Sequence, residues 1–256
     1  MPVFCEQSAG LATVTLSNPA RFNAMTRSMW RELAQVFHTL SADTALRAVV
    51  LRGDGEHFCA GGDISEYPAF RFQEPSLRAF HEDEVWGGLS AVLACPVPVM
   101  AQIDGNCMGA GVEIASCCDI RVASTRAQFG APIAKLGFPM APREAQLVAS
   151  RLGASVAAEM LLEAAVLPVS RLHGLGFVST VVSPDELAAA VGTRIARIAA
   201  MAPQAARANK ATLRALSTPG VDIEALVACA YDYADSPEHR EGIDAFLNKR
   251  TPRFAQ

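Results

Sequence analysis

The sequence predicts an α/β fold in which a mainly parallel sheet precedes a helical C-terminal third. Two observations lead to this prediction. Over the first 140 or so residues, short apolar runs alternate with stretches of helical periodicity, and after Ala141 long alanine- and leucine-rich stretches dominate. Strands that are separated by helices are typical of a parallel sheet with right-handed crossover connections. With 256 residues, of which 51% are hydrophobic, the chain can bury a sizeable core.

The first half contains four predicted strands and one clear amphipathic helix. The run at residues 11–16 alternates as a strand does and stops at Asn18-Pro19, a turn signal. Residues 26–40 have apolar positions at helical spacing, with Thr26 placed to act as the N-cap. The other predicted strands are residues 47–52, 98–103 and 119–123.

The last third is predicted to be mostly helical. Only residues 178–182 have the apolar, β-branched character of a strand. The predicted helices are residues 141–152, 155–163, 184–200, 203–216 and 221–233, and residues 66–76 form the most irregular stretch, a candidate flap.

Composition and charge exclude several classes of protein. The net charge is −4 and there is no lysine- or arginine-rich block, so nucleic acid and anionic membranes are not expected as partners. No signal peptide is evident at the start, and no apolar run reaches the roughly 18 residues of a membrane helix. The seven cysteines lack a C-x-x-C pair and fit reduced thiols. We therefore expect a cytoplasmic protein.

Two glycine-rich turns follow predicted strands. The first is Phe58 to Asp63 (FCAGGD) and the second is Gly105 to Gly111 (GNCMGAG), which opens a predicted helix over residues 111–118. Small residues let a ligand approach backbone N–H groups, and two such groups aimed at one point would stabilise an oxyanion. The plain alternative is that each is only a turn. A dinucleotide site is disfavoured because Ile114 occupies the position of the third glycine.

Glu113 is the only charged residue between Asp104 and Asp119, and its neighbours are apolar. Burying a lone carboxylate costs several kcal/mol unless it is paired or protonated. One interpretation is a carboxyl group that faces a cleft and acts as an acid or base with a raised pKa. The other is a carboxylate that pairs with an arginine or caps a helix. The residues alone leave both open.

At these positions the chain resembles the crotonase family, also called the enoyl-CoA hydratase/isomerase family. The resemblance covers nearly the whole length. It rests on residues 16–25 (LSNP and NAM), 58–63 (FCAGGD), 105–123, 128–137 (QFG and LG) and 241–250.

The resemblance implies a spiral of ββα units followed by a C-terminal helical region that forms a trimer, often a dimer of trimers. Residues 1–195 would then form the core with the ligand site, and residues 196–256 the helical region that mediates oligomerisation and closes the site. It also implies an acyl-CoA thioester as substrate. No metal and no separate cofactor would be needed, because CoA is part of the substrate.

The resemblance also assigns site residues. Gly62 and Ala110 would supply the two oxyanion N–H groups, and Glu113 would transfer protons. Contacts with CoA would come from Arg21, Phe22, Ala60, Gly62, Phe246 and Lys249, the last two toward a CoA that can belong to a neighbouring subunit.

One departure from the family pattern leaves the reaction open. The second glutamate of the family's hydratases falls here on Ile133, which cannot transfer a proton. Farther on, Arg143 and Glu144 stand where glycine is common; they either cap the next helix or enter the site. Glu144 or a residue of 82–84 could replace the missing acid. Three functions follow: a hydratase/isomerase with one family glutamate, a decarboxylase of malonyl-type thioesters, or an inert acyl-CoA-binding protein.

Overall fold

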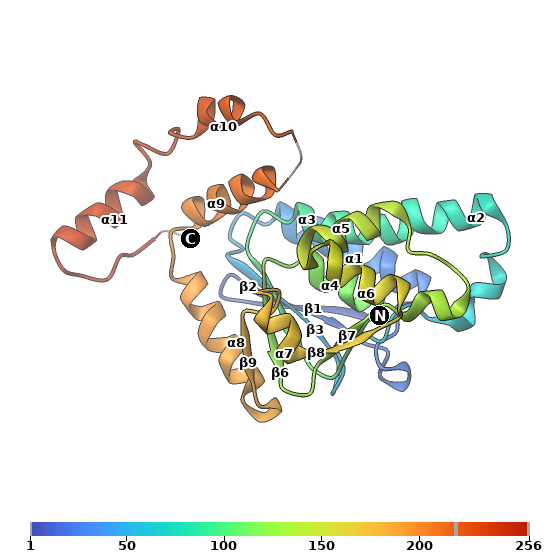
Figure 1. The fold of residues 1–256 in the computed structure, drawn as a ribbon. Coiled ribbons are helices and arrows are strands. Elements are labelled where there is room, and N and C mark those ends of the chain that lie inside the picture. The colour runs from blue at the N-terminus through green and yellow to red at the C-terminus, as the bar shows by residue number, and fades with distance from the viewer. Residues whose placement is uncertain (1, 218–219, 255–256) are drawn as a thin grey trace.

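The computed structural model describes residues 2–217 and 220–254, and its centre is a six-stranded sheet (Figure 1). The strand order is β1-β2-β3-β4-β6-β9, and every pair is parallel except β1 with β2. The predicted parallel sheet is thus confirmed, with an antiparallel strand added at one edge. The strands are β1 (Val3–Ser8), β2 (Leu11–Leu16), β3 (Ala48–Gly53), β4 (Val99–Ile103), β6 (Ile120–Ser124) and β9 (Thr180–Val182).

A second, three-stranded sheet was not predicted. It consists of β5 (Asn106–Met108), β7 (Gln128–Gly130) and β8 (Val166–Pro168) in the order β5-β7-β8. The prediction of a single strand after residue 141 was therefore wrong, because β8 joins β9 there. Three residues are too few to show a two-residue period, so these strands form through their pairing partners.

Helices cover the main sheet. Helix α1 (Arg27–Ala42) begins where the sequence predicts, and the Thr26 hydroxyl accepts a hydrogen bond from the Met29 N–H at 3.2 Å. On the opposite face of the sheet, α8 (Pro184–Ala199) packs Leu187 and Val191 against Val50 and neighbouring sheet residues. The remaining helices of this region are α2 (Glu74–Ala79), α3 (Trp86–Ala94), α4 (Ala110–Cys117), α5 (Pro142–Leu152), α6 (Ala154–Leu162), α7 (Val169–Gly174) and α8 (Pro184–Ala199).

Three C-terminal helices follow, and two of them stand away from the sheet (Figure 1). They are α9 (Pro203–Leu216), α10 (Ile223–Cys229) and α11 (Pro237–Leu247); α10 is shorter than the predicted helix. Helix α9 is tied to the body by Lys210, whose Nζ lies 2.7 Å from Asp119 Oδ2 and donates to the Val97 carbonyl at 2.8 Å. The division proposed at residues 195 and 196 falls within α8, and the independence of the two parts stays a prediction.

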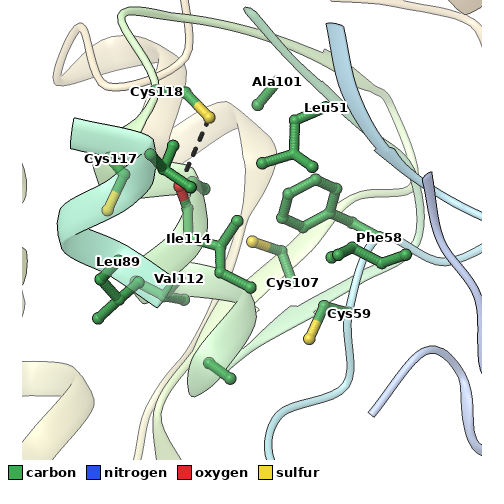
Figure 2. Packing of buried hydrophobic residues seen from close by; sticks show 14 of the residues in the cluster. Leu51, Phe58, Cys59, Leu89, Ala101, Cys107, Val112, Ile114, Cys117 and Cys118 are labelled. Carbon is green, nitrogen blue, oxygen red and sulfur yellow. Dashed lines mark hydrogen bonds between the residues drawn. The ribbon is translucent and has the colours of Figure 1, made fainter. Parts of the chain in front are cut away.

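The core around α4 is apolar and rich in sulfur (Figure 2). Cys59, Cys107, Cys117 and Cys118 are buried and unpaired there, and the Cys118 thiol contacts the Ile114 carbonyl at 3.5 Å. They pack with Leu51, Phe58 and Ile114 as small apolar side chains do. Every residue of α4 is buried, so this helix is held in one position by packing.

Among the described residues, no helix is at once long and apolar enough to cross a membrane.

We expect Ile114→Ala to lower the free energy of unfolding by about 2–5 kcal/mol, because Ile114 is fully buried and its loss leaves a cavity behind α4. Ile114→Val should cost only about 0.5–1.5 kcal/mol. Urea unfolding of both variants provides the measurement. Equal midpoints for the alanine variant and the wild type would show that this face of α4 is not packed as described.

Candidate active site

The two glycine-rich turns lie side by side. They leave β3 and β4, which are neighbouring parallel strands, and so reach the same edge of the sheet. The Cys59 N–H donates to the Asn106 carbonyl at 2.9 Å, and the Met108 N–H donates to the Cys59 carbonyl at 2.8 Å. This short parallel ladder holds the two turns together.

Two glycines with positive φ direct the next peptide N–H groups. Gly61 has φ 111° and Gly109 has φ 46°, values that L-residues with a side chain rarely adopt. Gly62 follows Gly61, and Ala110 follows Gly109. Ala110 is the first residue of α4. Within the described part of the chain, neither N–H donates to a protein acceptor. Both groups are therefore available to a ligand.

These N–H groups border a cavity of about 210 Å³. One wall is formed by the glycine turns and α4, and the facing walls by side chains from residues 64–85 and 132–144. Its lining is mostly apolar, as in small-molecule sites, with a few polar groups. Those polar side chains are Tyr67, Arg71, His81, Glu113 and Glu144.

Glu113 is buried and lines this cavity, with only 7% of its surface exposed. Burial raises the pKa of its carboxyl group well above the ordinary value of 4.5, and the nearby charge of Glu144 raises it further. No side-chain hydrogen bond to Glu113 exists among the described residues, and no arginine pairs with it. Of the two interpretations of Glu113, the structure favours a cleft-facing acid over a paired or capping carboxylate.

Glu144 enters the same cavity and is 3% exposed. Its Oε1 lies 2.8 Å from His81 Nδ1. Arg143, by contrast, turns outward, where its Nε lies 2.9 Å from Glu82 Oε2. Glu84 is engaged by Arg27 in a 2.5 Å ion pair. Of the acids considered as replacements for the missing glutamate, Glu144 is thus the one that lines the cavity.

Ile133 also lines the cavity and packs against the core. The position of the second family glutamate is therefore an apolar part of the wall.

The stretch expected to be an irregular flap contributes two polar groups that sequence analysis did not single out. Residues Ile64–Ala69 form a 3₁₀ helix, η2, that places the Tyr67 hydroxyl directly beside Gly62: a methyl group on Gly62 would lie 2.2 Å from it. Burial raises the pKa of Tyr67 to about 12. The Arg71 guanidinium stacks on Phe138, 3.7 Å from the ring centroid. The sequence pattern of this segment does not show that Tyr67 and Arg71 line the cavity, because that depends on how residues 66–76 pack against the rest of the protein.

His81 is a third polar residue of the cavity that the sequence alone does not point to. It lies in a π-helical turn, η3 (Phe80–Val85), between α2 and α3. Such turns are rare and occur often at functional sites.

Four of the residues expected to contact CoA lie in or beside the first glycine-rich turn, Phe58 to Asp63. Arg21 Nη1 lies 3.2 Å from Asp63 Oδ1, and the Ala60 N–H donates to the Phe22 carbonyl at 3.0 Å. Phe22 has φ 51° and is 53% exposed, with its ring edge-on to His57. Ala60 and Gly62 line the cavity itself. These contacts bring Arg21, Phe22, Ala60 and Gly62 together as one cluster beside the cavity.

The other two expected CoA contacts lie elsewhere. Phe246 is in α11, which extends away from the sheet body, and Lys249 follows it; neither lines the cavity. Phe246 is 82% exposed. Within one chain, these two residues do not join the site.

Among the residues that the structure describes, no three histidine, cysteine or acidic side chains are close enough together to hold a metal ion. The expectation that no metal or separate cofactor is needed stays a prediction.

Comparison with known proteins agrees with this geometry. The family description "Enoyl-CoA hydratase/isomerase" matches residues 6–256. The chain belongs to the enoyl-CoA hydratase/isomerase family. It is therefore an enzyme of that family, and the predicted crotonase-type fold is confirmed.

Several relatives illustrate the likeness. An enoyl-CoA hydratase/carnithine racemase from Magnetospirillum magneticum superposes with a TM-score of 0.96 at 37% sequence identity, over 100% of this chain and 96% of that one. The 2,3-dehydroadipyl-CoA hydratase of Escherichia coli is 30% identical over 94% of this chain and 93% of its own length. A probable enoyl-CoA hydratase of Mycobacterium bovis is 29% identical over 98% and 97% of the two chains.

The raised pKa of Glu113 predicts a stability effect in this enoyl-CoA hydratase/isomerase family member. A carboxyl group whose pKa is higher in the folded state destabilises the fold as pH rises from its ordinary value, 4.5, through the raised value. The loss amounts to about 1.4 kcal/mol for each pKa unit of the shift.

We therefore expect Glu113→Gln to unfold at higher denaturant concentration than the wild type above that pH window, with the difference shrinking toward pH 4.5. Glu163→Gln, an exposed glutamate at the end of α6, serves as the control and should show no such trend. A Glu113→Gln variant that is less stable than the wild type at all pH values would contradict the assignment.

Proposed function

We propose that this enzyme hydrates 2-enoyl-CoA thioesters through an enolate held by the Gly62 and Ala110 N–H groups, with Glu113 transferring a proton. The observation that carries the proposal is the convergence of two unengaged N–H groups and one buried acid on a single apolar cavity. The names of the relatives, several of them enoyl-CoA hydratases, support an acyl-CoA substrate.

The two proposed oxyanion donors are backbone N–H groups that belong to the glycine-rich turns. Water that attacks the β-carbon pushes charge onto the thioester oxygen, and the two N–H groups stabilise that charge. Ala110 is the first residue of α4, so its N–H points out of the positive end of the helix. Donors that are fixed before the reaction need no reorganisation when the charge develops, which makes such sites effective.

Glu113 is placed to act on the carbon next to that oxygen. Residues 110 and 113 are three apart on α4 and so lie on the same face of the helix. With its raised pKa, the Glu113 carboxyl group holds a proton that it can deliver to the α-carbon of the enolate.

The CoA part of the substrate would lie over the cluster of Arg21, Phe22, Ala60 and Gly62. Arg21 is a half-exposed cation beside the entrance, and Phe22 presents an exposed aromatic ring. Phe246 and Lys249 would reach a CoA bound to a neighbouring subunit, since neither approaches the cavity of its own chain.

Hydration is favoured over the two alternatives because the cavity holds two acids. Decarboxylation of a malonyl-type thioester needs one proton donor and would suit a cavity in which Glu113 is the single acid. Glu144 removes this argument. An inert binding protein would have no use for a buried carboxyl group whose ionisation destabilises the fold.

We also propose that the enzyme assembles as a trimer or a dimer of trimers through its C-terminal helices. Exposed large apolar side chains concentrate on α9 to α11 and the segments between them, a surface that suits a protein interface. They include Leu213, Leu216, Ile223, Val227, Tyr231, Ile243, Phe246 and Leu247.

Light scattering coupled to gel filtration should accordingly give a mass three or six times 27.1 kDa. Replacing Leu213 and Phe246 by aspartate should shift the mass toward the monomer, because a charge would enter the apolar interface. A wild-type protein that elutes as a monomer at micromolar concentration would contradict this assembly.

The central prediction concerns turnover of crotonyl-CoA, followed by loss of the conjugated thioester absorbance. The wild type should hydrate it, and Glu113→Gln should reduce kcat about 10²- to 10⁴-fold, the usual contribution of a general acid. Absence of turnover by the wild type, together with tight binding of the ester, would overturn the hydratase proposal.

A backbone variant tests the oxyanion site in the same assay. Proline is well tolerated at the first position of a helix, so Ala110→Pro removes the N–H while retaining α4. We expect kcat to fall about 10²- to 10³-fold. Ala110→Gly keeps the N–H and is the matched control, and it should retain most of the activity.

A further inference from the structure

Arg71, His81 and Glu144 form a hydrogen-bonded chain of three side chains, with Glu144 at its end. Arg71 Nη1 lies 3.4 Å from His81 Nε2, and His81 Nδ1 lies 2.8 Å from Glu144 Oε1. The three residues come from the segment after η2, from η3 and from the first turn of α5, and all three line the cavity. Elements distant in sequence thus meet at one carboxyl group.

The direction of the hydrogen bonds follows from the chemistry of arginine. A guanidinium group can only donate, so His81 Nε2 must accept from Arg71. The imidazole hydrogen then sits on Nδ1, which donates to Glu144. Glu144 is therefore an acceptor in this arrangement, the role of an ionised carboxylate.

Glu113 and Glu144 have contrasting surroundings. Glu144 accepts a hydrogen bond from His81, has the Arg71 cation beyond it and lies in the first turn of α5, where the helix dipole favours negative charge. Glu113 has no such donor among the described residues and lies among apolar neighbours. Two carboxyl groups in one site with opposite environments are suited to the roles of acid and base.

We propose that Glu144 is the general base of the hydration, the second catalytic carboxylate that Ile133 cannot be, and that His81 is its positioning residue. This inference rests on the proposed hydratase function. It gives the two acids separate tasks, with Glu144 acting at the β-carbon and Glu113 at the α-carbon.

The proton balance of the reaction is as follows. Glu144 takes a proton from water as the water oxygen bonds to the β-carbon, and the π electrons of the double bond move to the thioester enolate. Glu113 then gives its proton to the α-carbon. Glu144 ends protonated and Glu113 ionised, and transfer of one proton from Glu144 to Glu113, directly or through solvent, restores the starting state.

The test separates water activation from enolate chemistry. Hydration of crotonyl-CoA needs both acids. Exchange of the α-hydrogens of butyryl-CoA in D₂O needs no base at the β-carbon: once Glu113 has lost its own proton to solvent, it takes an α-hydrogen and returns a deuteron, while the oxyanion N–H groups hold the enolate. We expect Glu144→Gln to lower kcat for hydration about 10²- to 10⁴-fold and to leave the exchange rate within a few-fold of the wild type. Glu113→Gln should lower both rates, each by about 10²- to 10⁴-fold.

Matched variants distinguish catalysis from loss of structure. Glu82→Gln alters a nearby glutamate that pairs with Arg143 outside the cavity, and it should leave hydration unchanged. His81→Leu removes the donor to Glu144 and should cost about 10- to 100-fold, whereas His81→Asn retains a donor near the Nδ1 position and should recover most of that loss.

The outcomes are distinct. Hydration by Glu144→Gln at the wild-type rate would overturn the role of Glu144 while leaving the hydratase function intact. Parallel loss of hydration and exchange in Glu144→Gln would show a structural role and would also overturn it. Absence of hydration by the wild type would overturn both proposals.

Discussion

The active site depends on the close contact between two backbone turns. The ladder between Cys59 and Asn106–Met108 joins the ends of β3 and β4, and the oxyanion N–H groups and α4 are positioned by it. This contact uses main-chain hydrogen bonds and small residues, so it leaves no room for side chains between the turns. Main-chain hydrogen bonds thus fix the two turns relative to each other, which suits a site proposed to stabilise a developing charge.

Behind this contact, the fully buried helix α4 carries both a backbone donor and an acid. The helix packs against cysteines and aliphatic side chains (Figure 2), and Glu113 itself is buried. That environment destabilises the ionised carboxylate and raises the pKa of the Glu113 carboxyl group, a feature that suits the proton donor proposed for this site. A buried acid of this kind reduces the stability of the fold once it ionises, a cost that is common at functional sites.

The facing wall departs from the family pattern and still holds a carboxyl group. Ile133 keeps the wall apolar where a carboxylate is usual, and Glu144 brings a carboxylate into the same cavity from the start of α5. His81 and Arg71 reach it from elements that precede α4 in the chain. The polar groups of this wall thus form a connected set, in contrast to the isolated Glu113.

The sequence by itself determined the sheet, most helices, the two glycine turns and the importance of Glu113. These features depend on local signals: strand and helix periodicity, a capping threonine, and one charge in an apolar segment. Only the tertiary structure decided that β5, β7 and β8 pair, that Arg143 points outward while Glu144 points inward, and that Tyr67, Arg71 and His81 share a cavity with Glu113. Neighbours such as 143 and 144 differ only by the roughly 100° rotation between successive helical residues, and which of them faces the site is set by how α5 packs against α4.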